Sequence, residues 1–230
     1  MSRELIWLRP TPVASPTGRP AEWSRQQITT AAIAIADAEG LVAVTTRRVA
    51  AELGTGSASL YRHLDTRDDL IDLMIDHAFG EYEPLPDTDD WRADIIAEQL
   101  HLLNYLRRRP WLLDAILDRP PVGPNVVRLL ERSLARLADH PASGAAKMET
   151  VGVLNGMIQT FVRNERPGGS VLDEKFVAAQ TAILMNAAAD GAHPHLAAAL
   201  TSLGTNTGES ADDRLARILG LMLDGLLPRS

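Results

Sequence analysis

Apolar side chains recur at helical spacing along most of the chain, and polar or glycine residues mark where each helix begins and ends. The first such stretch begins at Ser24, which forms a capping-box pattern with Gln27. Apolar residues then recur three or four positions apart, and Gly40 ends the stretch. This pattern predicts a helix over residues 25–39.

Three further helices are predicted in the N-terminal third of the chain. Two short ones lie at about 46–53 and 57–63, and Gly54 between them can adopt the positive φ of a tight turn. Another begins at Thr66 with a second capping box and extends to about residue 82. Two short helices joined by a tight turn are typical of the helix-turn-helix, whose second helix enters the major groove of DNA.

Beyond residue 83, nearly every segment has helical periodicity, and prolines stand in the breaks. Strand-like alternation and hairpin dipeptides are absent from the sequence. We therefore expect an all-α protein, with a three-helix helix-turn-helix domain followed by a larger helical domain. The helices expected in the larger domain span residues 91–108, 111–118, 124–139, 144–165, 172–189, 194–203 and 211–227.

Changes in composition suggest the domain boundaries. Residues 1–22 are rich in proline and have no apolar period, which predicts a flexible arm. The helix-turn-helix domain would then span 23–66 and a connecting helix 67–83. The helical body would span 84–230, and its proline-rich, acidic start predicts a linker.

Charge is distributed unevenly along the chain. The net charge is −7, but residues 1–67 hold eight arginines against six acidic residues, a balance of +2. The rest of the chain holds fifteen basic residues against twenty-four acidic ones, a balance of −9. A basic head on an acidic body fits a protein whose head alone meets phosphates.

The absence of cysteine and of long apolar runs narrows the classes of protein to consider. Without cysteine there are no disulfides and no thiolate metal sites. No apolar run reaches the roughly 18–20 residues that a membrane span requires. We expect a cytoplasmic protein with no membrane partner.

Polar side chains in the segment 45–67 have the chemistry of a DNA contact surface. Thr45, Thr46, Tyr61 and His63 can donate hydrogen bonds to phosphate oxygens. The guanidinium of Arg47 can bind O6 and N7 of a guanine through two hydrogen bonds. Arg67, at the start of a helix, would bind phosphate. The alternative for the whole segment is a pair of amphipathic helices with a solvated polar face that contacts no DNA.

The order of these motifs resembles that of the tetracycline repressor (TetR) family over about residues 24–80. The matching elements are Glu39-Gly40, Thr45-Thr46-Arg47, Ala50-Ala51-Glu52-Leu53-Gly54, Leu60-Tyr61-Arg62-His63-Leu64 and Arg67-Asp68-Asp69-Leu70. The resemblance implies that Arg47, Ser57, Ala58 and Ser59 face the bases, and that Thr45, Thr46, Tyr61, His63 and Arg67 hold the backbone. Because the three residues from Ser57 to Ser59 are small, Arg47 is expected to carry much of the base reading.

The resemblance also implies a role for the rest of the chain. The body would be a ligand-binding and dimerisation domain, and the protein a homodimer on a pseudo-palindromic double-stranded operator. A small-molecule effector of unknown identity would release this repressor from DNA.

A small-molecule site needs a mostly apolar cavity with a few polar groups. Candidates are residues that share a helix face in the body, at spacings of three or four, or that lie on the next short helix. Core or interface packing is the alternative for each of them. The candidates are Glu98, His101, Leu102, Tyr105, Trp111, Ile116, Asn155 and Gln159.

Glycines inside two predicted helices indicate close approach of another helix, because glycine lowers helix propensity by about 1 kcal/mol. Gly152 and Gly156 are four residues apart on one of these helices. The last helix has an apolar face too wide for a lone surface helix, which includes Ile218 and Met222. We predict that these four residues lie in the dimer interface.

Other classes of function find less support. We see no nucleophile–base arrangement or carboxylate pair at sequence spacing, so we expect neither an enzyme nor a cofactor. His193 and His195 flank a proline without a nearby third ligand, so no metal site is expected. A DNA-binding architectural protein, or a regulator without an effector, is the alternative. A ligand cavity in the body would favour a regulator with an effector over these alternatives.

Overall fold

The computed structural model describes residues 5–9, 23–166, 174–205 and 208–227, in which all regular secondary structure is helical and no β-strand occurs. The chain divides into two compact units, Met1–His140 and Pro141–Ser230, which we describe separately. In the first unit the helices are η1 (Ile6–Leu8), α1 (Arg25–Glu39), η2 (Leu41–Ala43), α2 (Thr46–Glu52), α3 (Ser57–Leu60), α4 (Arg67–Gly80), α5 (Trp91–Arg108), α6 (Pro110–Asp118) and α7 (Pro124–Ala135). In the second they are α8 (Gly144–Glu165), α9 (Glu174–Ala189), α10 (Pro194–Thr205) and α11 (Ala211–Leu226). The all-α class predicted from the sequence is confirmed.

Helix α1 begins and ends as its sequence predicts. The Ser24 hydroxyl accepts a hydrogen bond from the Gln27 backbone N–H at 3.2 Å, and the Gln27 side chain accepts one from the Ser24 N–H at 2.9 Å. Gly40, with φ of 84°, ends the helix. Ile28 and Ala32 are fully buried on its inner face, so α1 contributes to the core of the helix-turn-helix domain, which we call the head.

Helices α2 and α3 form a helix-turn-helix, with Gly54 at φ of 66° in the turn between them. The second helix is shorter than the predicted 57–63, because regular α-helix stops at Leu60. The chain continues in a tight turn, in which the His63 N–H donates to the Leu60 carbonyl at 2.8 Å. Leu60 and Leu64 are both buried, so the turn remains anchored to the core of the head.

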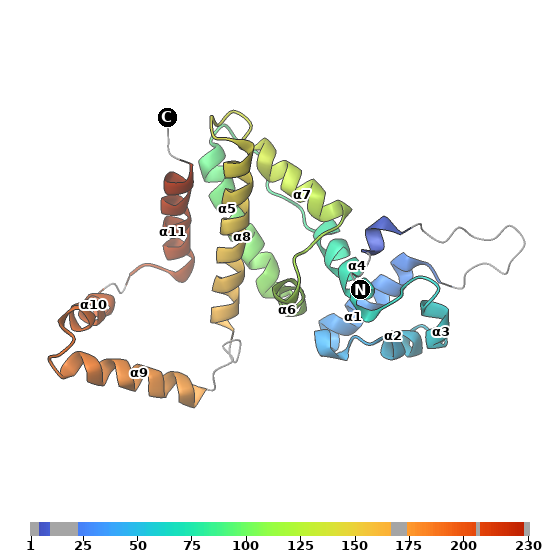
Figure 1. Ribbon diagram of the computed structural model, residues 1–230, viewed down its shortest axis with the longest axis horizontal. Helices are drawn as coiled ribbons and strands as arrows, with labels where there is room; N and C mark the ends of the chain where they lie inside the picture. The colour runs from blue at the N-terminus through green and yellow to red at the C-terminus, as the bar shows by residue number, and fades with distance from the viewer. Residues whose placement is uncertain (1–4, 10–22, 167–173, 206–207, 228–230) are drawn as a thin grey trace, which may run out of the picture. The chain divides into compact units, whose positions relative to one another are not determined.

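Helix α4 is the central element of the first unit. The predicted capping box is present, since the Thr66 hydroxyl accepts from the Asp69 N–H at 3.1 Å and the Asp69 carboxylate accepts from the Thr66 N–H at 3.0 Å. The helix contacts α1, α6 and α7 (Figure 1), and most of its residues are buried. The predicted connecting helix is therefore part of the core of this unit.

The described part of the predicted flexible arm is folded. Residues Ile6–Leu8 form a 3-10 turn, and Ile6 is only 1% exposed. Arg9 forms ion pairs with Asp65 and Asp69. The prediction of an arm over 1–22 is wrong for residues 5–9, because one buried apolar side chain and one ion-paired arginine leave no trace in the local periodicity. Residues 1–4 and 10–22 lie outside the described residues.

The segment between α4 and α5, predicted as a linker, is fixed by hydrogen bonds. The Glu98 carboxylate on α5 accepts from the Tyr82 hydroxyl at 2.5 Å and from the Leu85 N–H at 3.0 Å. The Asp94 carboxylate accepts from the Thr88 N–H and hydroxyl, both at 2.7 Å. Buried carboxylates thus hold this extended segment on α5.

In the second unit, α8 packs against α11, and α9 packs against α10. Large apolar side chains are exposed on α8, α9 and α11, an arrangement that marks surfaces used for association. They are Met148, Val153, Phe176, Val177, Ile183, Leu184, Met185, Leu221 and Leu226. No helix among the described residues is both long and apolar enough to cross a membrane.

Candidate nucleic-acid interface

The hydroxyl groups predicted to hold the DNA backbone lie at the start of α2 and just after α3. Thr45 is the exposed N-cap of α2, and its hydroxyl accepts from the Arg48 N–H at 3.0 Å. The hydroxyls of Thr46 and Tyr61 are 3.4 Å apart, which brings the two helices of the motif together at an exposed surface. Three of the predicted phosphate donors are therefore neighbours in space.

Adjacent arginines on α2 have different surroundings. Arg48 is paired with Glu39 at 2.8 Å and with Glu52 at 2.7 Å. Arg47 is exposed, and none of the residues that the structure describes pairs with it. Its guanidinium is free to reach a base edge, and the predicted base contact stays a prediction.

The recognition helix α3 presents small side chains. Ala58 is exposed, whereas Ser57 and Ser59 are half-buried. Arg62 follows as an exposed cation that the predicted contact set leaves out. Its place directly beside Tyr61 in the motif is a signal from which it could have been included.

His63 lies in an electropositive environment. The Arg25 side chain donates from Nε to the His63 carbonyl at 3.2 Å. Burial lowers the pKa of the His63 imidazole below its ordinary value, and the charges of Arg25 and Arg62 lower it further. Such surroundings favour the neutral ring until an anion, such as a phosphate, arrives.

Arg67 has a role within the chain. It donates from Nε to the Val44 carbonyl at 2.6 Å and from a terminal nitrogen to the Leu41 carbonyl at 2.9 Å. These bonds hold the start of α4 to the segment before α2. Its remaining nitrogen is what a phosphate would meet, and the predicted phosphate contact stays a prediction.

The predicted ligand residues of α5 have hydrogen-bonding partners in the chain. Besides Tyr82 and Leu85, Glu98 meets the Arg136 guanidinium at 3.1 Å. The Tyr105 hydroxyl donates to the Ala78 carbonyl at 2.5 Å, and burial raises its pKa to about 12. His101 Nε2 lies 3.1 Å from the carbonyl oxygen of Glu83. These groups fasten α5 to the end of α4 and to the segment that follows.

The other ligand candidates are distributed over three helices and both units. Trp111 and Ile116 are buried on α6, and the Trp111 indole N–H donates to the Asp37 carboxylate of α1 at 2.5 Å. Leu102 is half-buried on α5. Asn155 and Gln159 are half-buried on α8 in the second unit. Their role in effector binding stays a prediction.

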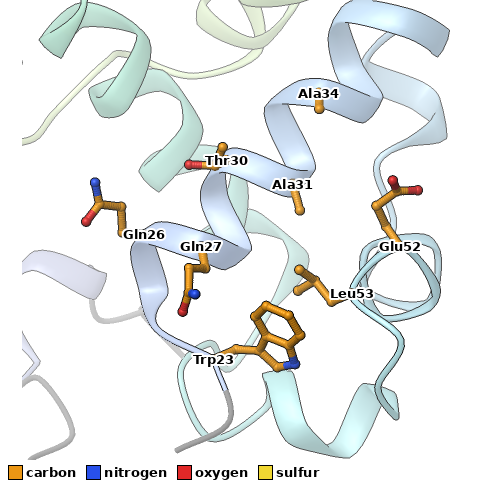
Figure 2. Close-up of a pocket in the computed structure, with 8 residues that line it drawn as sticks. All are labelled: Trp23, Gln26, Gln27, Thr30, Ala31, Ala34, Glu52 and Leu53. Atoms are coloured by element: carbon orange, nitrogen blue, oxygen red, sulfur yellow. The ribbon is translucent and has the colours of Figure 1, made fainter.

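A groove of about 470 Å³ lies on the head, between α1 and the end of α2. Figure 2 shows the Trp23 indole beside Leu53 at one end, with Gln27 and Thr30 along α1. Most of its lining side chains are exposed, and Glu52 contributes a carboxylate. The groove includes none of the predicted ligand residues, and its exposed, mixed lining differs from the enclosed apolar cavity that an effector requires.

The predicted interface residues of the second unit lie on the two helices that pack together. Gly152 and Gly156 of α8 are exposed, and a Cβ added at either would meet nothing within 4 Å. Among the residues that the structure describes, no close approach therefore requires these glycines. Ile218 and Met222 of α11 are half-buried. Participation in a dimer stays a prediction for all four.

Comparison with known families accounts for both parts of the chain. Residues 28–74 match bacterial regulatory proteins of the tetR family, and residues 83–229 match the tetracyclin repressor-like C-terminal domain. The chain belongs to the tetR family. Its helix-turn-helix is thus the DNA-binding part of a transcriptional regulator, as the order of motifs predicts.

Relatives and solved structures agree with this assignment across nearly the whole chain. The HTH-type transcriptional repressor DrrR1 of Streptomyces coeruleorubidus is 33% identical over 97% of this chain and 83% of its own length. Apo ActR of Streptomyces coelicolor is 26% identical with a TM-score of 0.73, covering 91% of this chain and 97% of that one. ActR in complex with actinorhodin is 28% identical with a TM-score of 0.71, covering 89% and 97%.

Proposed function

We propose that this tetR-family regulator is a homodimeric repressor that leaves a pseudo-palindromic operator when a small molecule binds its helical body. The observation that carries the proposal is the face formed by half-buried Thr46 with the exposed Thr45, Arg47 and Tyr61 at the junction of α2 and α3. It joins a base-reading cation to hydroxyl donors for phosphate. Support for an effector comes from ActR, whose structures include complexes with actinorhodin and (S)-DNPA.

Contacts between α4 and the segment from α6 to α7 offer a route for release. Asp68, Asp72 and Asp76 lie four residues apart on α4, so they share one face. Arg119, after α6, pairs with Asp68 at 2.8 Å and with Asp72 at 2.9 Å. A ligand that favours a different position of α6 would therefore also displace α4.

The same carboxylate face holds the first turn of α7. The Asp76 carboxylate accepts from the Asn125 backbone N–H and side-chain amide, both at 2.8 Å, and from the Val126 N–H at 3.3 Å. An acidic side chain at a helix N-terminus is favourable because the helix dipole is positive there. Carboxylates on α4 thus hold both the residue after α6 and the first turn of α7.

Release is then a shift between two conformations. The ligand moves the equilibrium only by the difference in its affinity for the two conformations. In a dimer, a change in the tilt of α4 alters the separation of the two recognition helices, which must meet major grooves about 34–36 Å apart. We infer that this happens in the cytoplasm, where the operator is accessible, and that the protein works as a regulator rather than as an enzyme.

Selection of bound duplexes from a random DNA pool tests the operator part of this function. We expect an enriched pseudo-palindrome whose half-sites are one helical turn apart or a multiple of that spacing. Enrichment of single half-sites would contradict a dimeric reader. No enrichment above the pool would contradict sequence-specific binding and favour an architectural role.

The effector part is tested on the selected duplex. Actinorhodin is the first probe, because ActR is related along most of the chain. A concentration-dependent release of the duplex, together with a higher melting temperature of the protein without DNA, is the expected result. A wider panel of small molecules from bacterial extracts follows if this probe fails, and failure of the whole panel would favour a regulator without an effector.

A further inference from the structure

The N-terminal segment Leu5–Arg9 is part of the head, although it precedes the region that matches the tetR-family DNA-binding domain. Ile6 is 1% exposed and ranks among the largest fully buried side chains. In Figure 1 its short turn lies close to α1 and the start of α4. The Arg9 side chain forms ion pairs between this segment and the rest of the head.

Arg9 joins this segment to the turn after the recognition helix. Its guanidinium pairs with Asp65 and, at 2.5 Å, with Asp69. The Arg9 side chain is 16% exposed and that of Asp69 is 0% exposed. The pair with Asp69 is therefore shielded from solvent, unlike a typical surface ion pair.

The two carboxylate oxygens of Asp69 have different partners. Oδ1 meets Arg9, whereas Oδ2 accepts from the backbone N–H groups of Asp65 at 2.8 Å and Thr66 at 3.0 Å. Those two hydrogen bonds fix the chain as it enters α4. Because a buried charge that loses a partner is destabilised, the pair with Arg9 stabilises Asp69 as a carboxylate.

The same turn is also held by Arg25, whose Nε donates to the His63 carbonyl. Arg9, Arg25, Asp65 and Asp69, which we call the Arg9 cluster, thus hold residues 63–66 through hydrogen bonds and ion pairs. This turn carries His63 and follows Tyr61, both predicted phosphate contacts. It lies on the segment that connects the recognition helix to α4.

We propose that Arg9 is a positioning residue for DNA binding: by neutralising Asp69 and pairing with Asp65, it holds the turn 63–66 so that α3 is presented correctly to the major groove. Arg9 acts through this turn and does not itself touch DNA. The inference rests on the proposed function, in that it assigns a further residue to the same DNA-binding site. It makes the docked N-terminal segment a condition for sequence-specific binding.

Arg9→Ala, compared with the wild type in the full chain, tests this role. We expect at least about fivefold weaker binding to the selected operator and little change in binding to a scrambled duplex, because only specific binding requires a correctly oriented α3. Arg62→Ala is the matched control. It also removes one arginine near the same turn, but Arg62 is exposed, and its loss as a phosphate contact should weaken both duplexes alike.

Conservative replacement and hydrogen exchange separate positioning from a general loss of stability. Arg9→Lys retains one charge toward Asp69 and should recover part of the lost operator affinity. In Arg9→Ala, the amide hydrogens of Asp65 and Thr66 should exchange faster, whereas amides in the middle of α1 should be unchanged. This measurement needs no DNA, so it tests the cluster even if the proposed function fails.

Three results would overturn the proposal. Equal weakening on both duplexes by Arg9→Ala would make Arg9 a phosphate contact. Unchanged exchange at Asp65 and Thr66 would show that the cluster does not hold the turn. Operator affinity equal to that of the wild type would show that the turn does not position α3.

Discussion

Arg47 and Arg48 are neighbours on α2, but only Arg48 is paired with carboxylates among the described residues. Glu39 and Glu52 occupy the guanidinium of Arg48, which leaves Arg47 as the exposed cation of α2. Arg47→Ala should cost about 1–3 kcal/mol of binding free energy on the best operator and relax discrimination at one base pair. Titration of the variant against single-base-substituted operators measures both effects.

Arg48→Ala is the control for this change. It removes the same charge from the same helix, but from a side chain already engaged with two carboxylates, so discrimination among the substituted operators should be retained. If Arg47→Ala weakened operator and scrambled DNA by the same factor, its base-reading role would be wrong.

His63 gives DNA binding a pH dependence whose sign follows from its surroundings. Burial, with the charges of Arg25 and Arg62, lowers the pKa of the free protein's imidazole below 6.5. A phosphate contact would raise this pKa again, so binding takes up a proton and operator affinity should increase as the pH falls from about 7.5 to 6. His63→Gln should abolish this component, and an unchanged slope in that variant would exclude His63 as a phosphate contact.

The stability of the free protein should depend on pH in the opposite direction. The unfolded chain protonates His63 near 6.5, whereas the folded chain does so only at lower pH. The unfolded state therefore binds more protons in this range, so this group's contribution to the free energy of unfolding is lost as the pH falls below about 6.5. Urea titrations of wild type and His63→Gln at pH 7.5 and 6 measure the difference.

At the scale of elements, the approach of α7 to α4 depends on Gly123. A Cβ at this position would lie 2.3 Å from Asp76 Oδ1 and 2.9 Å from Asp76 Cβ, so the carboxylate that caps α7 would have to move. Gly123→Ala should lower the free energy of unfolding by about 1–3 kcal/mol, as overpacking in an interior does. Urea unfolding at a fixed protein concentration measures this.

Gly144→Ala provides the comparison. A Cβ at Gly144, the first residue of α8, meets none of the described residues within 4 Å, and alanine favours helix more than glycine does. Its stability should stay within a few tenths of a kcal/mol of the wild type or increase. Equal effects of the two substitutions would show that the contact of Gly123 with Asp76 is unimportant.

Most element boundaries could be predicted because their signals are local. Ser24 and Thr66 cap α1 and α4 as their sequences indicate, and Gly54 provides the turn of the helix-turn-helix. The shorter α3 could not be foreseen, because residues 61–64 have helical spacing but are held by the burial of Leu64 rather than by continued helix.

The polar network of the first unit could not be predicted, because it joins residues far apart in the chain. Glu98 has the spacing of a pocket residue on α5, but its partner Arg136 is 38 positions away and Tyr82 is 16. Arg9 likewise finds Asp69 across 60 positions. Periodicity shows which face a side chain occupies and says nothing about which charge will meet it there.

At the scale of the whole molecule, the exposed apolar residues and open glycines of the second unit predict association. A dimer should have twice the chain mass of 25.0 kDa by native mass spectrometry. Gly156→Leu should favour the monomer, because a bulky side chain would enter the space that a partner helix is proposed to occupy, while a Cβ at this position meets none of the described residues within 4 Å.

Gly144→Leu, at the beginning of the same helix and equally open, is the control and should retain the dimer. A wild-type protein that is monomeric at micromolar concentration would contradict the dimer. Retention of the dimer in Gly156→Leu would place the interface elsewhere on the second unit.

The hydrogen bond between Trp111 of α6 and Asp37 of α1 means that the fluorescence of Trp111 can report on movement of α6. Trp111 is 2% exposed, and its indole faces a carboxylate on a helix of the head. If effector binding displaces α6 from α1, the emission of this indole should move to longer wavelength as water reaches it. Because the chain has only four tryptophans, subtraction of a Trp111→Phe spectrum isolates this signal. Induction would then be observed in unlabelled protein, without DNA.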